Sequence, residues 1–374
     1  MAHDESAFPW EIGVFDAHCH PTDTMASIAS IPAMTAATLT VMATRGEDQE
    51  LVRQTAEAHV DRVMPCFGWH PWFSHQIIDD SIEQPEQDAE QQKRTHYKAV
   101  LTPCPEDDEA FIQCLPQPKP LSTLISETRE RLLSFPNALV GEIGLDKSFR
   151  LPSAWTAEDL DGRNGQVTPG SREGRRLSPY KVKLDHQRTV LKAQLRLAGE
   201  LARAVSVHSV QAHGAIFELF KELWAGHERV VISRREREKQ QDAEGAVSED
   251  EADTTKSATG KQQPFPPRIC LHSYSGPVEP LRQFLHKANP SDVYFSFSSV
   301  INFTGSSASS RRVSDVIDAL PEDRVLVESD LHTAGPQMDE LLEQAARQIC
   351  EIRGWDLRRG VQQLADNWRR FVFG

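Results

Sequence analysis

GVFDAHCHPTD, residues 13–23, leads from an apolar stretch into two histidines that stand one residue apart. Side chains alternate between the two faces of a β-strand, so we expect Asp16, His18 and His20 on one face and the residues between them on the other. Two imidazoles on one face at the end of a strand can bind a metal ion together. The pattern is also compatible with hydrogen-bonded core histidines. Residues elsewhere in the chain are needed to distinguish a metal site from a structural pair.

Seven further apolar, β-rich runs follow the first one. The eight runs cover residues 13–20, 37–45, 61–71, 138–146, 203–210, 268–276, 292–299 and 323–330. Segments with apolar residues at helical spacing separate most of them, at residues 51–60, 121–135, 186–202 and 213–224. Strands that alternate with helices predict parallel βαβ units. Eight such units favour a closed (β/α)₈ barrel of the TIM type, and a doubly wound open sheet is the alternative.

The C-terminal part of the chain predicts two helices, near residues 337–353 and 357–371. The second helix carries an apolar stripe at helical spacing, formed by Val361, Leu364, Trp368 and Phe371. An apolar stripe on one side of a helix is typical of packing against a core. We therefore expect this helix to lie against the barrel wall.

Length and composition are those of a globular protein: 374 residues, 39% of them hydrophobic and 26% charged. The formal net charge of −14 argues against a general nucleic-acid-binding surface, although a local basic groove or bound metal ions remain compatible with it. The six cysteines show no CxxC spacing, which predicts reduced thiols in a cytoplasmic or nuclear protein. Neither a signal peptide nor a run of about 18 apolar residues is present, so we expect no membrane partner.

Three stretches depart from the alternation of strands and helices. Residues 79–120 are acidic and rich in Gln and Pro, residues 151–180 are polar and rich in turn residues, and residues 234–267 combine charge with low complexity. We interpret residues 1–374 as one barrel domain with these three insertions, the last of them disordered. The simplest interpretation makes them solvated spacers. The insertion at 151–180 follows a strand end with candidate site residues, which favours a place beside the substrate.

Titratable residues stand at the ends of most predicted strands: His18, His20, His70, Glu142, Asp146, His208, His272, Glu328 and Asp330. The C-terminal ends of barrel strands meet at one mouth, so these side chains are expected to converge. Imidazoles combined with carboxylates suit Zn²⁺, Mn²⁺ or a similar divalent ion. They are too many for one tetrahedral site, which predicts two metal ions with Glu142 as a candidate bridge. Two ions about 3.5–4 Å apart are typical of hydrolysis, phosphodiester cleavage above all.

The motifs DAHCHP, GWHPW, GEIGLD, VHS, HSYSG and ESD, in this order, resemble those of the TatD-type metal-dependent deoxyribonuclease family, with insertions similar to those of its divergent fungal members. The resemblance covers the eight strands and the last helix, but none of the insertions. It implies an amidohydrolase-like barrel that binds two divalent ions, Zn, Mn or Mg, and cleaves DNA or another phosphodiester. The residues that it implies as metal ligands are His18, His20, Glu142, His208, His272 and Asp330.

The same resemblance implies roles for single residues. His18, His20, Glu142 and Asp330 would hold one ion, and Glu142 would bridge to a second ion on the other two histidines. His70, the histidine of the GxHP motif, would line the phosphate-facing side. Asp330 would also orient or deprotonate the attacking water. Asp146 either orients a ligand or a loop, or caps a turn.

Two departures from the family pattern lie around the metal-binding positions rather than in them. The family usually has Ser-Arg after the fifth-strand histidine, whereas Val210 stands at the place of that Arg here. After the eighth strand the family has an apolar residue and Pro, whereas ESDLHTAG, residues 328–335, offers His332. We predict a deoxyribonuclease. The alternatives are a barrel with little or no activity that binds a protein partner through its insertions, and a hydrolase of small-molecule amides or esters.

Overall fold

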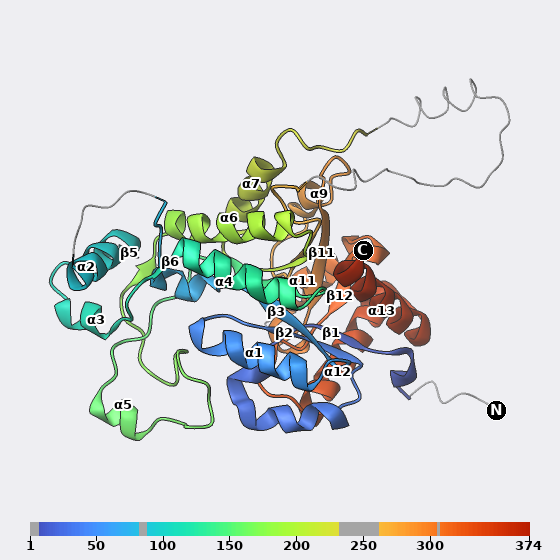
Figure 1. Ribbon diagram of the computed structural model, residues 1–374. Coiled ribbons are helices and arrows are strands. Elements are labelled where there is room, and N and C mark those ends of the chain that lie inside the picture. The colour runs from blue at the N-terminus through green and yellow to red at the C-terminus, as the bar shows by residue number, and fades with distance from the viewer. Residues whose placement is uncertain (1–6, 82–87, 232–261, 305–306) are drawn as a thin grey trace.

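The computed structural model describes residues 7–81, 88–231, 262–304 and 307–374, and its centre is an eight-stranded parallel sheet (Figure 1). The strands, in order around the sheet, are β1 (Phe15–Cys19), β2 (Thr38–Met42), β3 (Val63–Phe67), β7 (Leu139–Asp146), β9 (Val205–Val210), β10 (Arg268–Leu271), β11 (Asp292–Phe297) and β12 (Val325–Val327). Backbone hydrogen bonds from Asp330 N–H to the His18 carbonyl and from His20 N–H to the Leu331 carbonyl join the two ends. The barrel is nearly closed. The eight predicted strands and the barrel are therefore confirmed, and the alternative of a doubly wound open sheet is excluded.

Helices follow the strands and cover the outside of the barrel (Figure 1). The longer ones are α1 (Gly46–Ala58), α4 (Leu121–Ser134), α6 (Leu184–Glu200), α7 (His213–Trp224), α11 (Ser307–Ala319), α12 (Pro336–Arg353) and α13 (Leu357–Phe373). Short helical turns complete the connections: η1 (Trp10–Ile12), η2 (Pro21–Ala33), η3 (Pro71–Gln76), α9 (Leu281–Phe284), α10 (Ser299–Asn302) and η4 (Glu322–Arg324). The predicted helices are confirmed, with boundaries that differ by a few residues. No helix in the described part of the chain has the length and hydropathy that a membrane crossing requires.

Alternate side chains of the strands divide between an outer and an inner apolar layer. Val41, Val207 and Phe295 belong to the outer cluster, which packs against the helices. The inner cluster takes one residue from each strand or from the position before it, together with three from α13: Ala17, Met42, Cys66, Leu139, Ala204, Cys270, Tyr294, Leu326, Trp368, Phe371 and Val372. Trp368 and Phe371, two of the four residues of the predicted C-terminal stripe, therefore pack into one end of the barrel rather than against its wall. Arg268, the first residue of β10, donates to the carbonyl of Phe371, so α13 lies at the N-terminal end and leaves the C-terminal mouth open to polar groups.

The strand pairing is interrupted where the first site residues lie. The register shifts between Asp16 and Cys19 on β1, and such bulges change the direction of side chains. Ala17 lies in the inner cluster and Cys19 in the outer one, so the strict alternation that we expected along β1 is wrong. Asp16 does not point at the histidines. Its carboxylate accepts hydrogen bonds from the backbone N–H of His18 (3.0 Å) and from the N–H and hydroxyl of Ser329 (3.0 and 2.5 Å), which ties β1 to the end of β12.

The first two insertions fold together beside the barrel, at the left of Figure 1. The first contains α2 (Ala89–Val100), α3 (Glu109–Cys114), β5 (Leu101–Thr102) and β6 (Lys119–Pro120), and the second contains α5 (Ala157–Asp161). β5 pairs with β8 (Lys181–Val182), and β6 pairs with β4 (Ile77–Ile78). Tyr97, Phe111, Leu151 and Tyr180 share a small apolar core, so these insertions are more than solvated spacers. Residues 234–261 of the third insertion, predicted to be disordered, lie outside the described residues, whereas its end is ordered, with Phe265 buried in the outer apolar cluster.

Gly144 on β7 provides the first test of how the fold positions the site. A Cβ atom at this position would lie 2.0 Å from the carbonyl oxygen of His208 on the neighbouring strand, and its φ is +158°. We expect Gly144→Ala to lower the melting temperature by several degrees because the strand has to shift. Gly214→Ala is the matched control, since a Cβ there meets nothing within 4 Å. Equal melting temperatures of both variants and the wild type in thermal denaturation would contradict the packing described here.

Candidate metal centre

The buried carboxylate of Glu142 on β7 is the point on which the predicted site residues converge. Its Oε1 atom lies 2.8 Å from His272 Nε2, 2.9 Å from His208 Nδ1 and 3.0 Å from His70 Nε2. His208 lies near the end of β9, and the other two imidazoles lie just beyond the ends of β10 and β3. One carboxylate oxygen is thus shared by three ring nitrogens.

The other oxygen of Glu142 faces a second group of residues. Oε2 lies 3.5 Å from His18 Nε2 and 3.4 Å from His20 Nε2. Asp330 Oδ1 lies 3.8 and 3.6 Å from the same two nitrogens. The structure therefore brings together all of the residues predicted as ligands, and it places Glu142 between the two groups. Their assignment as metal ligands stays a prediction.

The donor set fits divalent metal ions. His18 Nε2 and His20 Nε2 face each other at 3.0 Å, and His208 Nδ1 and His272 Nε2 at 3.3 Å. Four buried imidazoles that aim ring nitrogens at one carboxylate are stabilised when cations accept their lone pairs. The combination of imidazole and carboxylate ligands suits Zn²⁺ and Mn²⁺ in particular.

Hydrogen bonds on the far side of the rings determine which nitrogen faces the centre. His18 Nδ1 is hydrogen-bonded to Ser206 Oγ at 2.8 Å, which leaves Nε2 toward Glu142. His208 Nε2 donates to Asp146 Oδ2 at 3.1 Å, which leaves Nδ1 toward Glu142. Partners of this kind fix the tautomer and the orientation of ligating histidines.

Asp146 combines the two roles that the sequence left open. Its Oδ1 atom accepts the backbone N–H groups of Ser148 (2.6 Å) and Phe149 (2.9 Å), which caps the turn after β7. Its Oδ2 atom accepts from His208 and from the indole N–H of Trp72 at 2.7 Å. The same carboxylate therefore fixes the turn and orients His208.

His70 differs from the other imidazoles of the centre. It caps η3, and its Nδ1 accepts the backbone N–H of Trp72 at 3.2 Å. In the neutral ring the proton then lies on Nε2, which donates to Glu142 Oε1 at 3.0 Å. His70 therefore presents a hydrogen-bond donor to the centre, whereas His18 and His208 present a lone pair.

The surrounding imidazoles hold the carboxylates of the centre in their ionised form. Burial opposes the charge of Glu142, but the neighbouring His70, His272 and His18 outweigh it and hold the pKa of this carboxyl well below its usual range. Burial also opposes the charge of Asp330, yet the hydrogen bond from His20 and the nearby imidazoles lower its pKa to about 2. Burial lowers the pKa of His70 to about 4, only partly offset by Glu142. Both carboxylates are ionised at neutral pH, and His70 is neutral.

Sequence reasoning placed Glu328 at a strand end without giving it a role, and it gave no role to several other residues around this centre. Glu328 is fully buried, with Oε1 3.6 Å from His272 Nδ1. Arg45 and Asp23 form an ion pair of 2.8 Å close to the mouth. Trp72 stacks on Phe149 with ring centroids 4.5 Å apart. Arg45 stands at the end of the second predicted strand, and that position is the signal that could have found it.

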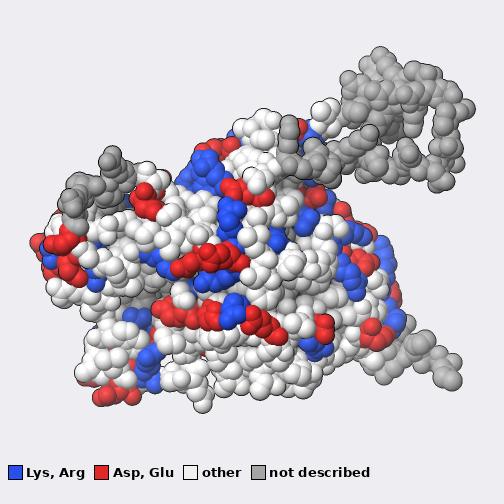
Figure 2. All heavy atoms as spheres, viewed as in Figure 1, with Lys and Arg blue, Asp and Glu red and all other residues white. Residues whose placement is uncertain are grey.

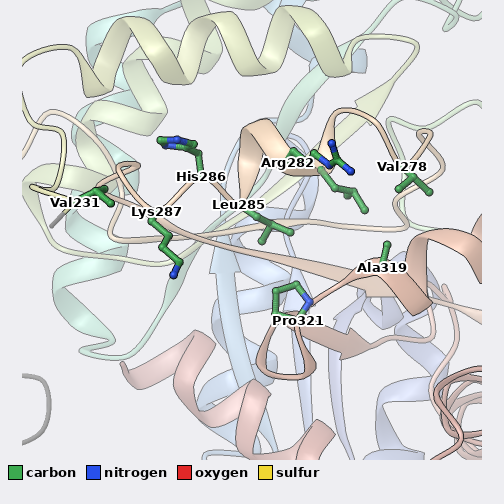
Figure 3. A pocket seen from close by; sticks show the side chains of 9 residues that line it. Val231, Val278, Arg282, Leu285, His286, Lys287, Ala319 and Pro321 are labelled. Atoms are coloured by element: carbon green, nitrogen blue, oxygen red, sulfur yellow. The ribbon is translucent and has the colours of Figure 1, made fainter. Parts of the chain in front are cut away.

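The remaining surface offers no competing centre in the residues described. On the face in Figure 2, acidic and basic side chains lie interleaved and form no broad basic surface. A groove of about 520 Å³ lies beside α9, and its lining includes His286 but none of the histidines of the centre (Figure 3). It is lined by Leu281, Leu285 and Pro321, with Arg282 and Lys287 at its edge, and it carries no cluster that could hold a metal.

A nearly closed (β/α)₈ barrel with buried histidines and carboxylates at its C-terminal mouth defines a metal-dependent hydrolase. A model of the family described as TatD related DNase matches residues 15–373, and the chain belongs to this family. The resemblance found in the motifs is thereby confirmed.

Similar proteins extend over nearly the whole chain. It is 36% identical over 359 residues to Cut9-interacting protein scn1 of Schizosaccharomyces pombe, which covers 96% of this chain and 98% of that protein. It is 28% identical over 374 residues to Uncharacterized deoxyribonuclease YMR262W of Saccharomyces cerevisiae, with the same coverage. The fold is similar to that of YJJV, a TatD homologue from Escherichia coli, with a TM-score of 0.52, 16% identity and coverage of 96% and 97%.

Asp146→Asn tests the orientation of His208. The amide oxygen can still cap the turn, but its NH₂ group would face the N–H groups of His208 and Trp72, where no acceptor remains. Loss of such a partner weakens metal binding by about 10–100-fold. We expect metal content, measured by elemental analysis after dialysis against a competing chelator, to fall, while exposed Asp107→Asn behaves as wild type. Full metal retention by Asp146→Asn would show that His208 needs no such support.

Proposed function

We propose that the protein is a two-metal phosphodiesterase and that its substrate is DNA. The position of Glu142 carries this proposal, because its two oxygens face two different sets of ligand atoms, which adjoin where His18 stacks on His272. The residues proposed to hold the ions are His18, His20, Glu142, His208, His272 and Asp330. Zn²⁺, Mn²⁺ or Mg²⁺ are the candidates. Such a pair of ions, when bound, activates water and neutralises charge on the phosphate.

The protein's own residues supply proton transfer and orientation. Asp330 is the more exposed of the two proposed carboxylate ligands, with 15% of its side chain accessible, and its backbone N–H donates to the His18 carbonyl. We assign to Asp330 the orientation of the attacking water and the acceptance of its proton. His70 donates from Nε2, which suits a hydrogen bond to a phosphate oxygen as negative charge develops there.

DNA is favoured by the names attached to the family and to the budding-yeast relative. Two other functions follow from specific observations. The same ligand set would hydrolyse an ester or amide of a small molecule. The name of the fission-yeast relative supports a protein partner, for which the folded lobe of the first two insertions offers a surface, and a cytoplasmic or nuclear location fits either role.

Glu142→Gln tests the mechanism. Removing the charge leaves the surrounding imidazoles without their shared anion, so we expect loss of bound metal and a decrease in DNA cleavage of at least about 100-fold. Glu130→Gln, on an exposed position of α4, is the matched control and is expected to keep both. Metal content and cleavage of labelled single- and double-stranded DNA are the measurements. Cleavage that survives in Glu142→Gln would overturn the proposed mechanism.

A substrate panel separates the proposed functions. We expect the purified protein, after chelation and addition of Mn²⁺ or Zn²⁺, to cleave DNA faster than aryl esters or acyl amides, because two ions stabilise the doubly charged centre of a phosphodiester displacement. Metal bound in stoichiometric amount without cleavage of any nucleic acid would exclude the nuclease and leave the esterase or the partner-binding protein.

A further inference from the structure

An exposed histidine at the rim of the centre is held in place by buried groups. His332 follows β12, and 62% of its side chain is accessible. Its Nδ1–H donates to Asp23 Oδ2 at 2.7 Å. Its ring is stacked near that of His20, with centroids 5.3 Å apart and an angle of 19° between the planes. Nε2 has no hydrogen-bond partner in the described part of the chain, so this nitrogen is available to a ligand beside the centre.

The support of His332 is built from buried charge. Asp23 Oδ1 accepts from Arg45 Nη2 at 2.8 Å, and the Arg45 side chain is only 2% accessible. The same guanidinium donates to Asp48 Oδ2 at 3.2 Å and to the carbonyl of Pro169 at 2.8 Å. Burying a guanidinium is unfavourable unless every donor is satisfied. Here Arg45 fixes Oδ1 of Asp23, and Oδ2 of the same carboxylate fixes His332.

The second insertion completes this support. Thr168 N–H donates to the carbonyl of Asp23 at 2.8 Å, and the Thr168 hydroxyl donates to the carbonyl of Thr22 at 2.5 Å. Just before the insertion, Phe149 stacks on Trp72 beside His70. The insertion and the turn before it therefore contact the rim at two places.

We propose that His332 is a substrate-binding residue, whose Nε2 hydrogen-bonds an oxygen of the nucleotide next to the scissile phosphodiester, and that Asp23 and Arg45 position it. This inference rests on the proposed function. It explains why a ring that is mostly exposed to solvent has a fixed orientation. Asp23 accepts the hydrogen bond from Nδ1, and stacking on His20 fixes the plane of the ring. Nε2 then remains free to contact the substrate. The alternative is that the Asp23–His332 contact only joins η2 to the segment after β12.

His332→Ala and His332→Gln distinguish these two roles. We expect His332→Ala to raise KM for DNA about tenfold, the effect of one lost hydrogen bond, with kcat changed less. The amide of Gln reaches the place of Nε2, so His332→Gln is expected to recover most of the loss. Asp23→Asn is expected to lie between wild type and His332→Ala. His286→Ala, an exposed histidine beside α9, is the control and should equal wild type.

Three further measurements do not depend on turnover. Binding of a fluorescent phosphorothioate oligonucleotide in EDTA, followed by anisotropy, should weaken in His332→Ala by a similar factor. Melting temperature and metal content should stay at wild-type values. Unchanged KM and unchanged oligonucleotide binding in His332→Ala, with an active wild type, would overturn the inference. So would a lowered melting temperature with no recovery in His332→Gln. A wild-type protein that cleaves no nucleic acid would instead overturn the proposed function itself.

Discussion

The carboxylate of Glu142 is buried at the C-terminal mouth of the barrel, where no solvent compensates its charge. A buried carboxylate is tolerated only when partners surround it, and here those partners are imidazoles from strands far apart in the sequence. Each imidazole can reach it only if its strand has the right register and tilt. The closure of the sheet, the bulge on β1 and the close contact at Gly144 therefore all serve one geometric condition.

A second layer of hydrogen bonds makes this condition specific. Ser206 holds His18 and Asp146 holds His208, each through the nitrogen that does not face Glu142. Because these bonds fix the tautomers, the centre presents lone pairs and anionic oxygens, and His70 is the exception that presents a donor. An imidazole that presents a lone pair can bind a cation, whereas His70, which presents an N–H group, can donate to a phosphate oxygen.

The sequence predicts most of this centre because strand ends meet in a barrel. Runs of β-rich residues locate the strands, and the polar residue at the end of each run then belongs to the mouth. His18, Glu142 and Asp330 are found in this way. The register shift between Asp16 and Cys19 is not found in this way, because register depends on the neighbouring strand. The shared core of the first two insertions also escapes prediction, since it combines residues as distant as Tyr97 and Tyr180.

Unlike the residues of the centre, those at the rim of the mouth cannot be predicted from the ends of strands. Asp23 and His332 are 309 positions apart, and both lie in connections without a regular period, so only the folded chain brings them together. The metal ligands are determined by the coordination geometry of the ion, which is the same wherever the ion binds. The residues at the rim are determined by the substrate. A chain that retains the ligand set but lacks Arg after the fifth-strand histidine has to recognise its substrate with other groups. The second insertion, through Thr168, and the turn before it, through Phe149, contact both places where such groups stand, so we expect substrate recognition to depend on this segment as well as on the barrel.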